Sequence, residues 1–361
     1  MHRLESFVVR AAPAHLYLAA MVAISVLDLA PIIEGGDAGQ ALRNSLDVAR
    51  HAERLGFRRY WMAEHHNMPG VASAATSTAL AYVGAGTSTI RIGAGGVMLP
   101  NHAPLVIAEQ FGTLDALFPG RVDLGLGRAP GTDGLTARAL RRTLVGGEER
   151  FPQDVVELLR FLAPVEAGQA VRAVPGGGAD LEVWILGSST YGAQLAAVLG
   201  LPYAFASHFA PGEMMRAAEI YRAQFQPSER LARPYLLFGL NVVAAETDDE
   251  ARFLASSIMQ AFLALRTGRP GPLPPPIAEF ETRIESDGRG LLSGVLSEAI
   301  VGSAATVEAR LRAFVGRTDA DEIMITSSIF DHAARLRSFE IAAEAAARAF
   351  AAHGETEPSM A

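Results

Sequence analysis

Residues 90–127 have the sequence IRIGAGGVMLPNHAPLVIAEQFGTLDALFPGRVDLGLG. Its first ten residues form a largely apolar run that predicts a strand. Residues 104–118 repeat apolar side chains at helical spacing, with Pro104 near the first turn. Residues 121–127 predict a second strand. A strand, a helix and another strand in this order are typical of α/β proteins with parallel sheets.

The same alternation runs along the rest of the chain. Further strands are predicted at 23–28, 58–63, 181–187, 202–207, 235–245 and 321–327, and further helices at 37–56, 73–86, 190–199, 212–225, 247–265, 304–316 and 332–352. Regular alternation of this extent favours a TIM (β/α)8 barrel over an open sheet with a separate domain. We therefore predict an α/β protein with one barrel domain over 21–361. Its insertions, at 129–180 and at the Pro-rich 267–300, fall at the C-terminal face, where the second is able to cover a pocket.

Composition excludes several chemistries. The chain has no cysteine, which excludes thiolate nucleophiles, iron–sulfur clusters, Cys-bound zinc and disulfides. Its basic residues are all arginine, which excludes a Schiff-base lysine and a P-loop lysine. Redox chemistry therefore needs a bound organic cofactor, or a metal held by histidine and carboxylates. The net charge of −8 and the scattered arginines argue against nucleic-acid binding.

The first twenty residues are predicted to be an N-terminal extension. An apolar run from Leu16 to Leu27 follows Arg3 and Arg10, as in a signal peptide, but it is too short to span a bilayer. The run continues into the strand predicted at 23–28, so cleavage would remove an element of the core. We therefore expect a cytoplasmic protein, with Met21 as a candidate start.

Polar and small side chains gather at the ends of the predicted strands. In a (β/α)8 barrel the active site is built where strands end and the following loops begin. The candidates are Glu64, His65 and His66 after the second strand; Gly95, Gly96 and His102 in and after the third; Arg128 after the fourth; Ser188, Ser189, Tyr191 and Gly192 after the fifth; and His208 after the sixth.

Several of these motifs have a plain structural explanation beside a functional one. Polar residues at strand ends simply meet water. Gly95 and Gly96 fit either a barrel bend or the close approach of a flat ring to the backbone. The segment GSSTYG, residues 187–192, fits either ordinary helix capping or an anion at a helix N-terminus. Arg128 is explained either by a surface ion pair or by binding to a phosphate, whose oxygens match the planar guanidinium.

Metal binding and dinucleotide binding are not expected. His65 and His66 follow each other in a predicted strand, whose successive residues point to opposite faces, and no HxH or HExxH supports them as ligands with Glu64. The segment GLGRAPG around Arg128 has the wrong spacing for a dinucleotide fingerprint and follows the fourth strand, not the first. We interpret His66, His102 and His208 as candidate substrate contacts.

Five segments together resemble the bacterial luciferase-like, flavin-dependent monooxygenase family, and within it the single-chain oxidoreductases. They are SVLDLAPI (25–32), AEHHNMPG (63–70), residues 93–133, residues 184–209 and DEIMITSSIFDHAARLRSFE (321–340). In order, they span roughly residues 22 to 350. The resemblance implies a TIM barrel that binds reduced FMN at its C-terminal face, adds dioxygen at the flavin C4a position and oxygenates a small organic substrate.

The resemblance also implies residue roles. His65 matches the family's catalytic histidine, beside Glu64. Gly95 and Gly96 match a pair whose backbone lies against the isoalloxazine ring, joined by a peptide that is often cis in relatives. Arg128 matches the arginine that grips the FMN phosphate; Ser188 and Ser189, with the backbone of Tyr191 and Gly192, match the phosphate loop. The light-emitting luciferase subunit has a Glu where Ser188 stands and a Thr where Gly192 stands, so the phosphate contacts differ in detail.

The preferred hypothesis is an FMN-dependent monooxygenase. A separate NAD(P)H:flavin reductase would supply its FMNH2, because the chain has no nicotinamide fingerprint. Alternatives are a deazaflavin (F420) oxidoreductase, a non-catalytic flavin-binding protein, and a serine hydrolase, for which GSSTY has Tyr191 in place of the final glycine of the nucleophile motif. The sequence leaves the substrate open among long-chain aldehydes, alkanesulfonates and natural-product intermediates. The resemblance also suggests a homodimer through the early helices.

Overall fold

The computed structural model describes residues 22–129, 134–140 and 149–351. Its centre is a closed barrel of parallel strands, paired in the order β1-β2-β3-β4-β5-β6-β7-β9 with β9 beside β1. The strands are β1 (Ala23–Asp28), β2 (Arg59–Met62), β3 (Arg91–Met98), β4 (Val122–Gly127), β5 (Glu182–Gly187), β6 (Tyr203–Phe205), β7 (Leu236–Ala244) and β9 (Glu322–Thr326). The predicted TIM barrel is therefore confirmed.

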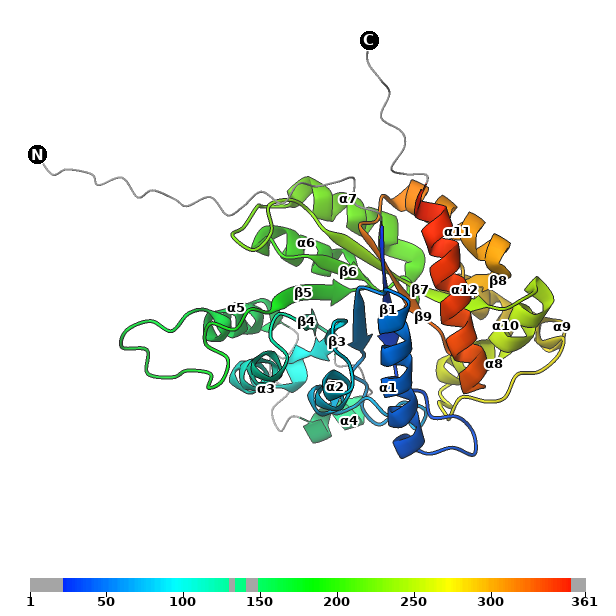
Figure 1. The fold of residues 1–361 in the computed structure, drawn as a ribbon, viewed down its shortest axis with the longest axis horizontal. Coiled ribbons are helices and arrows are strands. Elements are labelled where there is room, and N and C mark those ends of the chain that lie inside the picture. Colours follow the sequence, from blue (N-terminus) through cyan, green and yellow to red (C-terminus); the bar gives the residue numbers. More distant parts are fainter. Residues whose placement is uncertain (1–21, 130–133, 141–148, 352–361) are drawn as a thin grey trace, which may run out of the picture.

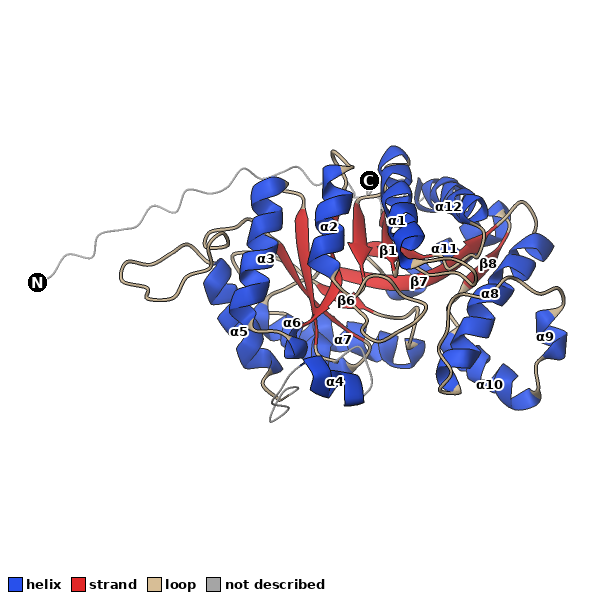
Figure 2. Cartoon of the chain, turned by 90° about the horizontal axis from the view of Figure 1, so that it is seen from below, coloured by secondary structure: helices blue, strands red, loops and turns tan. Residues whose placement is uncertain are grey.

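Helices pack around the outside of the strands (Figure 1; Figure 2). They are α1 (Ala38–Arg54), α2 (Thr76–Ala85), α3 (Pro104–Leu117), α4 (Gly134–Leu140), α5 (Phe151–Leu162), α6 (Thr190–Leu199), α7 (Met214–Gln224), α8 (Asp248–Arg266), α9 (Phe280–Arg283), α10 (Ser286–Val295), α11 (Ala304–Thr318) and α12 (His332–Ala351). Two 3-10 turns, η1 (Leu99–Asn101) and η2 (Pro211–Glu213), precede α3 and α7. Helices α8, α9 and α10 lie at one end of the molecule, on the right of both figures.

Apolar side chains fill both faces of the barrel wall. Successive strand residues alternate between the two faces, so Val26 packs toward the helices while Leu27 points into the barrel. The barrel interior is filled by Trp61 and Trp184, whose rings meet edge to face at 5.2 Å, together with Leu237 and smaller neighbours. A filled barrel is not a channel, so a ligand can enter only at an end.

A buried ionic cluster fills the N-terminal end of the barrel. Arg59, the first residue of β2, is fully buried, and its guanidinium lies 2.8 Å from Asp123, 3.0 Å from Glu182 and 2.9 Å from Glu322. Burial would lower the pKa of Arg59, but the three carboxylates, Glu322 most of all, raise it well above its usual value. These charged pairs occupy the end of the barrel opposite the predicted active site.

Two parts of the architecture differ from the sequence prediction. The interval 129–180, predicted as an insertion, contains α5, which is the helix of the fourth strand–helix unit. The interval 267–300, predicted as an irregular loop, contains α9, α10 and the first residue of β8 (Ile300–Gly302). Strand β8 pairs with the C-terminal end of β7. Short segments such as α9 and α10 depend on packing against a neighbour, and their sequence pattern alone is too weak to detect. Helix α5 was missed because it lies far from β4 along the chain.

The Pro-rich part of this interval lies over loops at the C-terminal end of the barrel. Leu273 makes backbone hydrogen bonds with Ile32 and Glu34 in the loop after β1. Its neighbour Gly271 packs closely against Gly70 in the loop after β2, since a Cβ at Gly70 would come within 2.2 Å of the Gly271 oxygen. The predicted extension at 1–20 and Met21 lie outside the described residues. Across the parts of the chain that are described, none of the helices has the length and hydropathy needed to span a bilayer.

Candidate active site

The predicted site residues lie at the C-terminal ends of five neighbouring strands, β2 to β6. Glu64, His65 and His66 follow β2; Gly95 and Gly96 are in β3, and His102 follows η1; Arg128 follows β4; Ser188 and Ser189 follow β5 and lead into α6, which contains Tyr191 and Gly192; His208 follows β6. Because parallel strands end at the same rim, these residues surround one barrel mouth.

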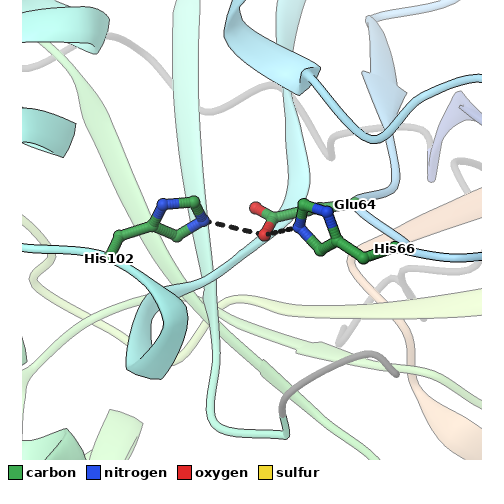
Figure 3. Close-up of side chains that lie close together, drawn as sticks. All are labelled: Glu64, His66 and His102. Carbon is green, nitrogen blue, oxygen red and sulfur yellow. Dashed lines mark hydrogen bonds and ion pairs between the residues drawn. The ribbon is translucent and has the colours of Figure 1, made fainter. Parts of the chain in front are cut away.

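Glu64 is the centre of a hydrogen-bonded cluster at this rim (Figure 3). Its Oε1 atom lies 2.8 Å from Nε2 of His66 and 2.8 Å from Nε2 of His102, which approach it from opposite sides. Its Oε2 atom accepts a hydrogen bond of 3.1 Å from the backbone N–H of Met98. The Glu64 carboxylate thus ties the loop after β2 to the end of β3 and to the turn that follows.

This cluster favours the charged form of the Glu64 carboxylate, and both of its oxygens already accept hydrogen bonds. Glu64 is only 2 % exposed, and burial alone would raise its pKa; the hydrogen bonds and charge of His102, with those of His66 and Met98, bring the pKa below its ordinary value. Both imidazoles use Nε2 in these bonds. Glu64 therefore acts in this structure as a positioning group for two loops.

The local geometry corrects one step of the sequence argument. Strand β2 ends at Met62, so Glu64, His65 and His66 lie in a loop where the two-face alternation of a strand does not apply. As a result, single ligand atoms of Glu64, His66 and His102 lie within 4.8 Å of one another, close enough to hold a metal ion. Spacing between neighbouring histidines does not indicate His102, which η1 brings beside Glu64 from a distant part of the sequence. The hydrogen bonds to Glu64 account for this arrangement without an ion.

His65 differs from His66 in its surroundings. Its Nδ1 atom is buried and has no hydrogen-bond partner among the described residues. Burial lowers the pKa of His65, and the nearby Glu64 carboxylate offsets only part of that effect. Buried polar side-chain atoms are usually hydrogen-bonded, so we expect a ligand or a water molecule to bond the Nδ1 atom of His65.

Gly95 and Gly96 sit at an irregularity of β3. The peptide between them is cis, as the resemblance predicted, and the register with β4 shifts between Ala94 and Val97. A Cβ at Gly95 would come within 2.8 Å of Trp61, and one at Gly96 within 2.3 Å of Leu186. Packing inside the barrel therefore requires glycine at both positions, whether or not a flat ring approaches their backbone.

Arg128 and Tyr191 are brought together from different strand–helix units. The Arg128 guanidinium lies over the Tyr191 ring, 4.3 Å from its centroid. The side chain is half-buried and makes no ion pair or hydrogen bond with any residue that the structure describes. Among those residues, Arg128 therefore does not form the surface ion pair that we considered as an alternative. The N–H donors of the stacked guanidinium are available to bind an anion.

The turn before α6 leaves a second set of donors beside Arg128. Ser189 is the N-cap residue, with extended backbone, but its side chain makes no capping hydrogen bond. The first N–H groups of a helix have no partner within the helix, and they favour a negative group. Ordinary side-chain capping therefore does not explain the two serines, and the start of α6 together with Arg128 forms an arrangement suited to phosphate.

Comparison with known proteins agrees with this fold. The model of the luciferase-like monooxygenase family matches residues 22–321. A luciferase-like monooxygenase of Escherichia coli K12 is 53% identical over 321 residues, covering 89% of this chain and 96% of that protein. The crystal structure of apo-MsnO8 superposes with a TM-score of 0.83 at 34% identity, covering 90% of this chain and 98% of that one.

More distant structures share the fold alone. One is the oxygenating constituent of 3,6-diketocamphane monooxygenase from Pseudomonas putida, solved with FMN (16% identity, TM-score 0.68, covering 90% of this chain and 97% of that one). Another is an F420-dependent secondary alcohol dehydrogenase (12% identity, TM-score 0.66, covering 91% and 99%). The family match over most of the chain and the close relatives lead to one conclusion: the chain belongs to the luciferase-like monooxygenase family.

Proposed function

We propose that the protein is an FMN-dependent monooxygenase that uses FMNH2 and dioxygen to oxygenate a small organic substrate. The main support for the proposal is the position of Arg128. This cation has no anionic partner among the described residues, and it lies beside the start of α6, which no side chain caps. A phosphate monoester such as that of FMN would satisfy both sets of donors.

The residues at the mouth fit this cofactor. Arg128, Ser188, Ser189 and the backbone of Tyr191 and Gly192 would hold the phosphate. The backbone of β3 at Gly95 and Gly96 would lie against the ring system, and the unpartnered nitrogen of His65 would face its reacting end. FMNH2, when bound, supplies the two electrons of the reaction, in which one atom of dioxygen enters the substrate and the other leaves as water.

His65 and Glu64 would have different tasks. With its pKa lowered by burial, His65 is a neutral imidazole at neutral pH, able to accept a proton on one ring nitrogen and to donate from the other. The Glu64 carboxylate is already occupied by His66 and His102, so it would act by holding the loop that carries His65. We therefore assign proton transfer to His65 and positioning to Glu64.

A deazaflavin (F420) oxidoreductase is the second candidate. It is favoured by the F420-dependent enzymes that share the fold. The motif Glu64–His65–His66 and the single phosphate-binding arrangement at α6 weigh against it. Direct comparison of the two cofactors decides between the candidates.

The phosphate assignment predicts a selective loss of affinity. Arg128→Met should weaken FMNH2 binding about tenfold to a hundredfold, since a charge-assisted hydrogen bond contributes roughly 1.5–3 kcal/mol. Riboflavin, which has no phosphate, should bind Arg128→Met and the parent equally. Anaerobic titration of both flavins measures this, with Arg43→Met, a change on the exposed face of α1, as the control. Equal losses for both flavins would remove Arg128 from the phosphate site.

We also propose that a separate NAD(P)H:flavin reductase supplies FMNH2. The chain with FMN should oxidise NADPH no faster than FMN alone, and oxidation should begin when a flavin reductase is added. Absorbance at the nicotinamide band follows the reaction. Rapid NADPH oxidation by the isolated chain would instead identify a self-sufficient flavin oxidoreductase.

A further inference from the structure

Glu64 is a buried carboxylate that no arginine balances. Among the described residues, its ion-pair partners are His66 and His102. The chain has no lysine, and an imidazole, unlike a guanidinium, is not permanently charged. Buried charges in proteins are usually paired with an opposite charge or coordinate a metal ion. Within the part of the chain that the structure describes, the Glu64 carboxylate therefore has no permanently charged partner.

Three ligand atoms converge at this carboxylate (Figure 3). Both imidazoles present Nε2 to the Glu64 Oε1 atom, each at 2.8 Å, and single ligand atoms of the three residues lie within 4.8 Å of one another. An imidazole nitrogen directs its N–H bond or its lone pair along the same line in the ring plane. Rings that are aimed at Oε1 for a hydrogen bond are therefore also aimed at an ion bound beside Oε1.

Only a small adjustment separates the hydrogen-bonded cluster from a coordinated ion. Around a tetrahedral Zn²⁺ ion, a histidine nitrogen and a carboxylate oxygen lie roughly 3.4 Å apart, so each imidazole would retreat from Oε1 by about 0.6 Å. Both imidazoles are partly exposed at the rim, which leaves them this freedom. The carboxylate is held from behind, since Oε2 accepts the Met98 N–H at 3.1 Å. An outer hydrogen bond of this kind orients a metal ligand.

The donor set selects the class of ion. Mg²⁺ and Ca²⁺ prefer oxygen donors, whereas imidazole nitrogens favour Zn²⁺, Co²⁺, Ni²⁺ and Cu²⁺. Two nitrogens and one carboxylate oxygen are the protein ligands of many zinc sites, in which water or another small ligand takes the fourth position. The cluster is therefore suited to a divalent transition metal with one exchangeable ligand.

We propose that Glu64, His66 and His102 bind a divalent transition-metal ion of the Zn²⁺ class, and that the hydrogen-bonded cluster is the metal-free form of this site. The bound ion would join the loop after β2 to the turn η1, which precedes His102. His65 lies between two of the ligands in the sequence, so the ion would also fix the loop that carries it. The inference does not depend on the proposed flavin chemistry, because flavin supplies none of the ligands.

Metal titration of the untagged, flavin-free full chain tests the proposal. After treatment with EDTA and its removal, the chain should bind one Zn²⁺ ion in competition with a chromophoric chelator, and Mg²⁺ should not displace it. Co²⁺, used as a visible probe, should give an absorption spectrum that differs from that of the hydrated ion and that Zn²⁺ abolishes. Failure of the chain to bind Zn²⁺ and Co²⁺ would overturn the proposal.

Ligand variants locate the ion. His102→Gln and Glu64→Gln should each weaken Zn²⁺ binding at least about a hundredfold, because loss of a partner outside the ligand shell already costs about tenfold to a hundredfold. His332→Gln is the matched control, since it removes another imidazole that bonds a carboxylate, that of Asp47 at 2.9 Å. It should bind Zn²⁺ as the parent does. Equal affinities in His102→Gln and the parent would place the ion elsewhere and overturn the proposal.

Thermal unfolding gives a second readout. An ion that binds only the folded chain raises its Tm, so saturating Zn²⁺ should raise the Tm of the parent and of His332→Gln but not that of His102→Gln. If Glu64→Gln does not fold, His102→Gln, which changes a partly exposed side chain, decides the proposal. A rise of the same size in His102→Gln would overturn it. Titration of separate samples with FMN tests the cofactor assignment, so a failure of flavin binding is distinguished from a failure of metal binding.

Discussion

His65→Ala should form product about a hundredfold to ten-thousandfold more slowly than the parent chain, the usual contribution of a positioned acid–base group. FMNH2 binding should change by no more than a few fold, because the proposed phosphate contacts at Arg128 and α6 are untouched. The oxygen consumed should appear as hydrogen peroxide in place of product. An oxygen electrode with and without catalase, together with chromatography of a substrate that the parent converts, measures both quantities.

His66→Ala is the matched comparison for this prediction. His66 bonds Glu64 at the rim, so its loss should affect stability more than chemistry. If His66→Ala abolished product formation while His65→Ala did not, the roles assigned to the two imidazoles would be reversed. If neither variant changed the rate, neither imidazole would take part in the chemistry.

Arg59→Met should lower the free energy of unfolding by about 3–5 kcal/mol, the cost of breaking a buried ion pair from one side. The change leaves Glu322 fully buried without its cation and leaves Asp123 with Arg91 alone. It also removes the guanidinium that lies 4.8 Å from the Trp184 ring centroid. Because the cluster lies at the opposite end of the barrel from the mouth, FMN affinity of the folded variant should be unchanged. Urea unfolding and flavin titration measure the two effects.

Arg312→Met provides the control for Arg59. Its guanidinium pairs with Glu308 on the partly exposed outer surface of α11, where an ion pair contributes less than about 1 kcal/mol. A loss of similar size in both variants would show that the buried cluster has no special role in stability. Loss of flavin binding in folded Arg59→Met would show that the two ends of the barrel are coupled.

The repeating strands were predictable from sequence because each carries a strong local signal. All eight barrel strands fall within the predicted intervals, and α1 begins after Asp37, at the start of the helix predicted at 37–56. Helix α5 has the apolar spacing of Phe151, Val155, Leu158 and Leu162, but it lies far from β4 along the chain. We did not assign α5 to the fourth strand–helix unit because it lies far from β4 in the sequence, and not because its apolar pattern is weak.

The shared position of the candidate site residues was predictable, and the contacts among them were less so. Placing polar residues at strand ends gathered Glu64, His65 and Arg128 at one mouth, because barrel topology fixes which ends meet. It did not show that Glu64 binds both His66 and His102, since that depends on where β2 stops and how η1 turns.

The most direct test of the cofactor assignment is an anaerobic titration of the purified chain with FMNH2 and, separately, with reduced F420. We predict saturable binding of FMNH2 at one site per chain, at least about tenfold tighter than reduced F420, a difference of roughly 1.4 kcal/mol. It also predicts that inorganic phosphate competes with FMNH2, because both would use the donors of Arg128 and the start of α6. Tighter binding of reduced F420, or no binding of FMNH2, would contradict the proposal that this barrel is an FMN-dependent monooxygenase.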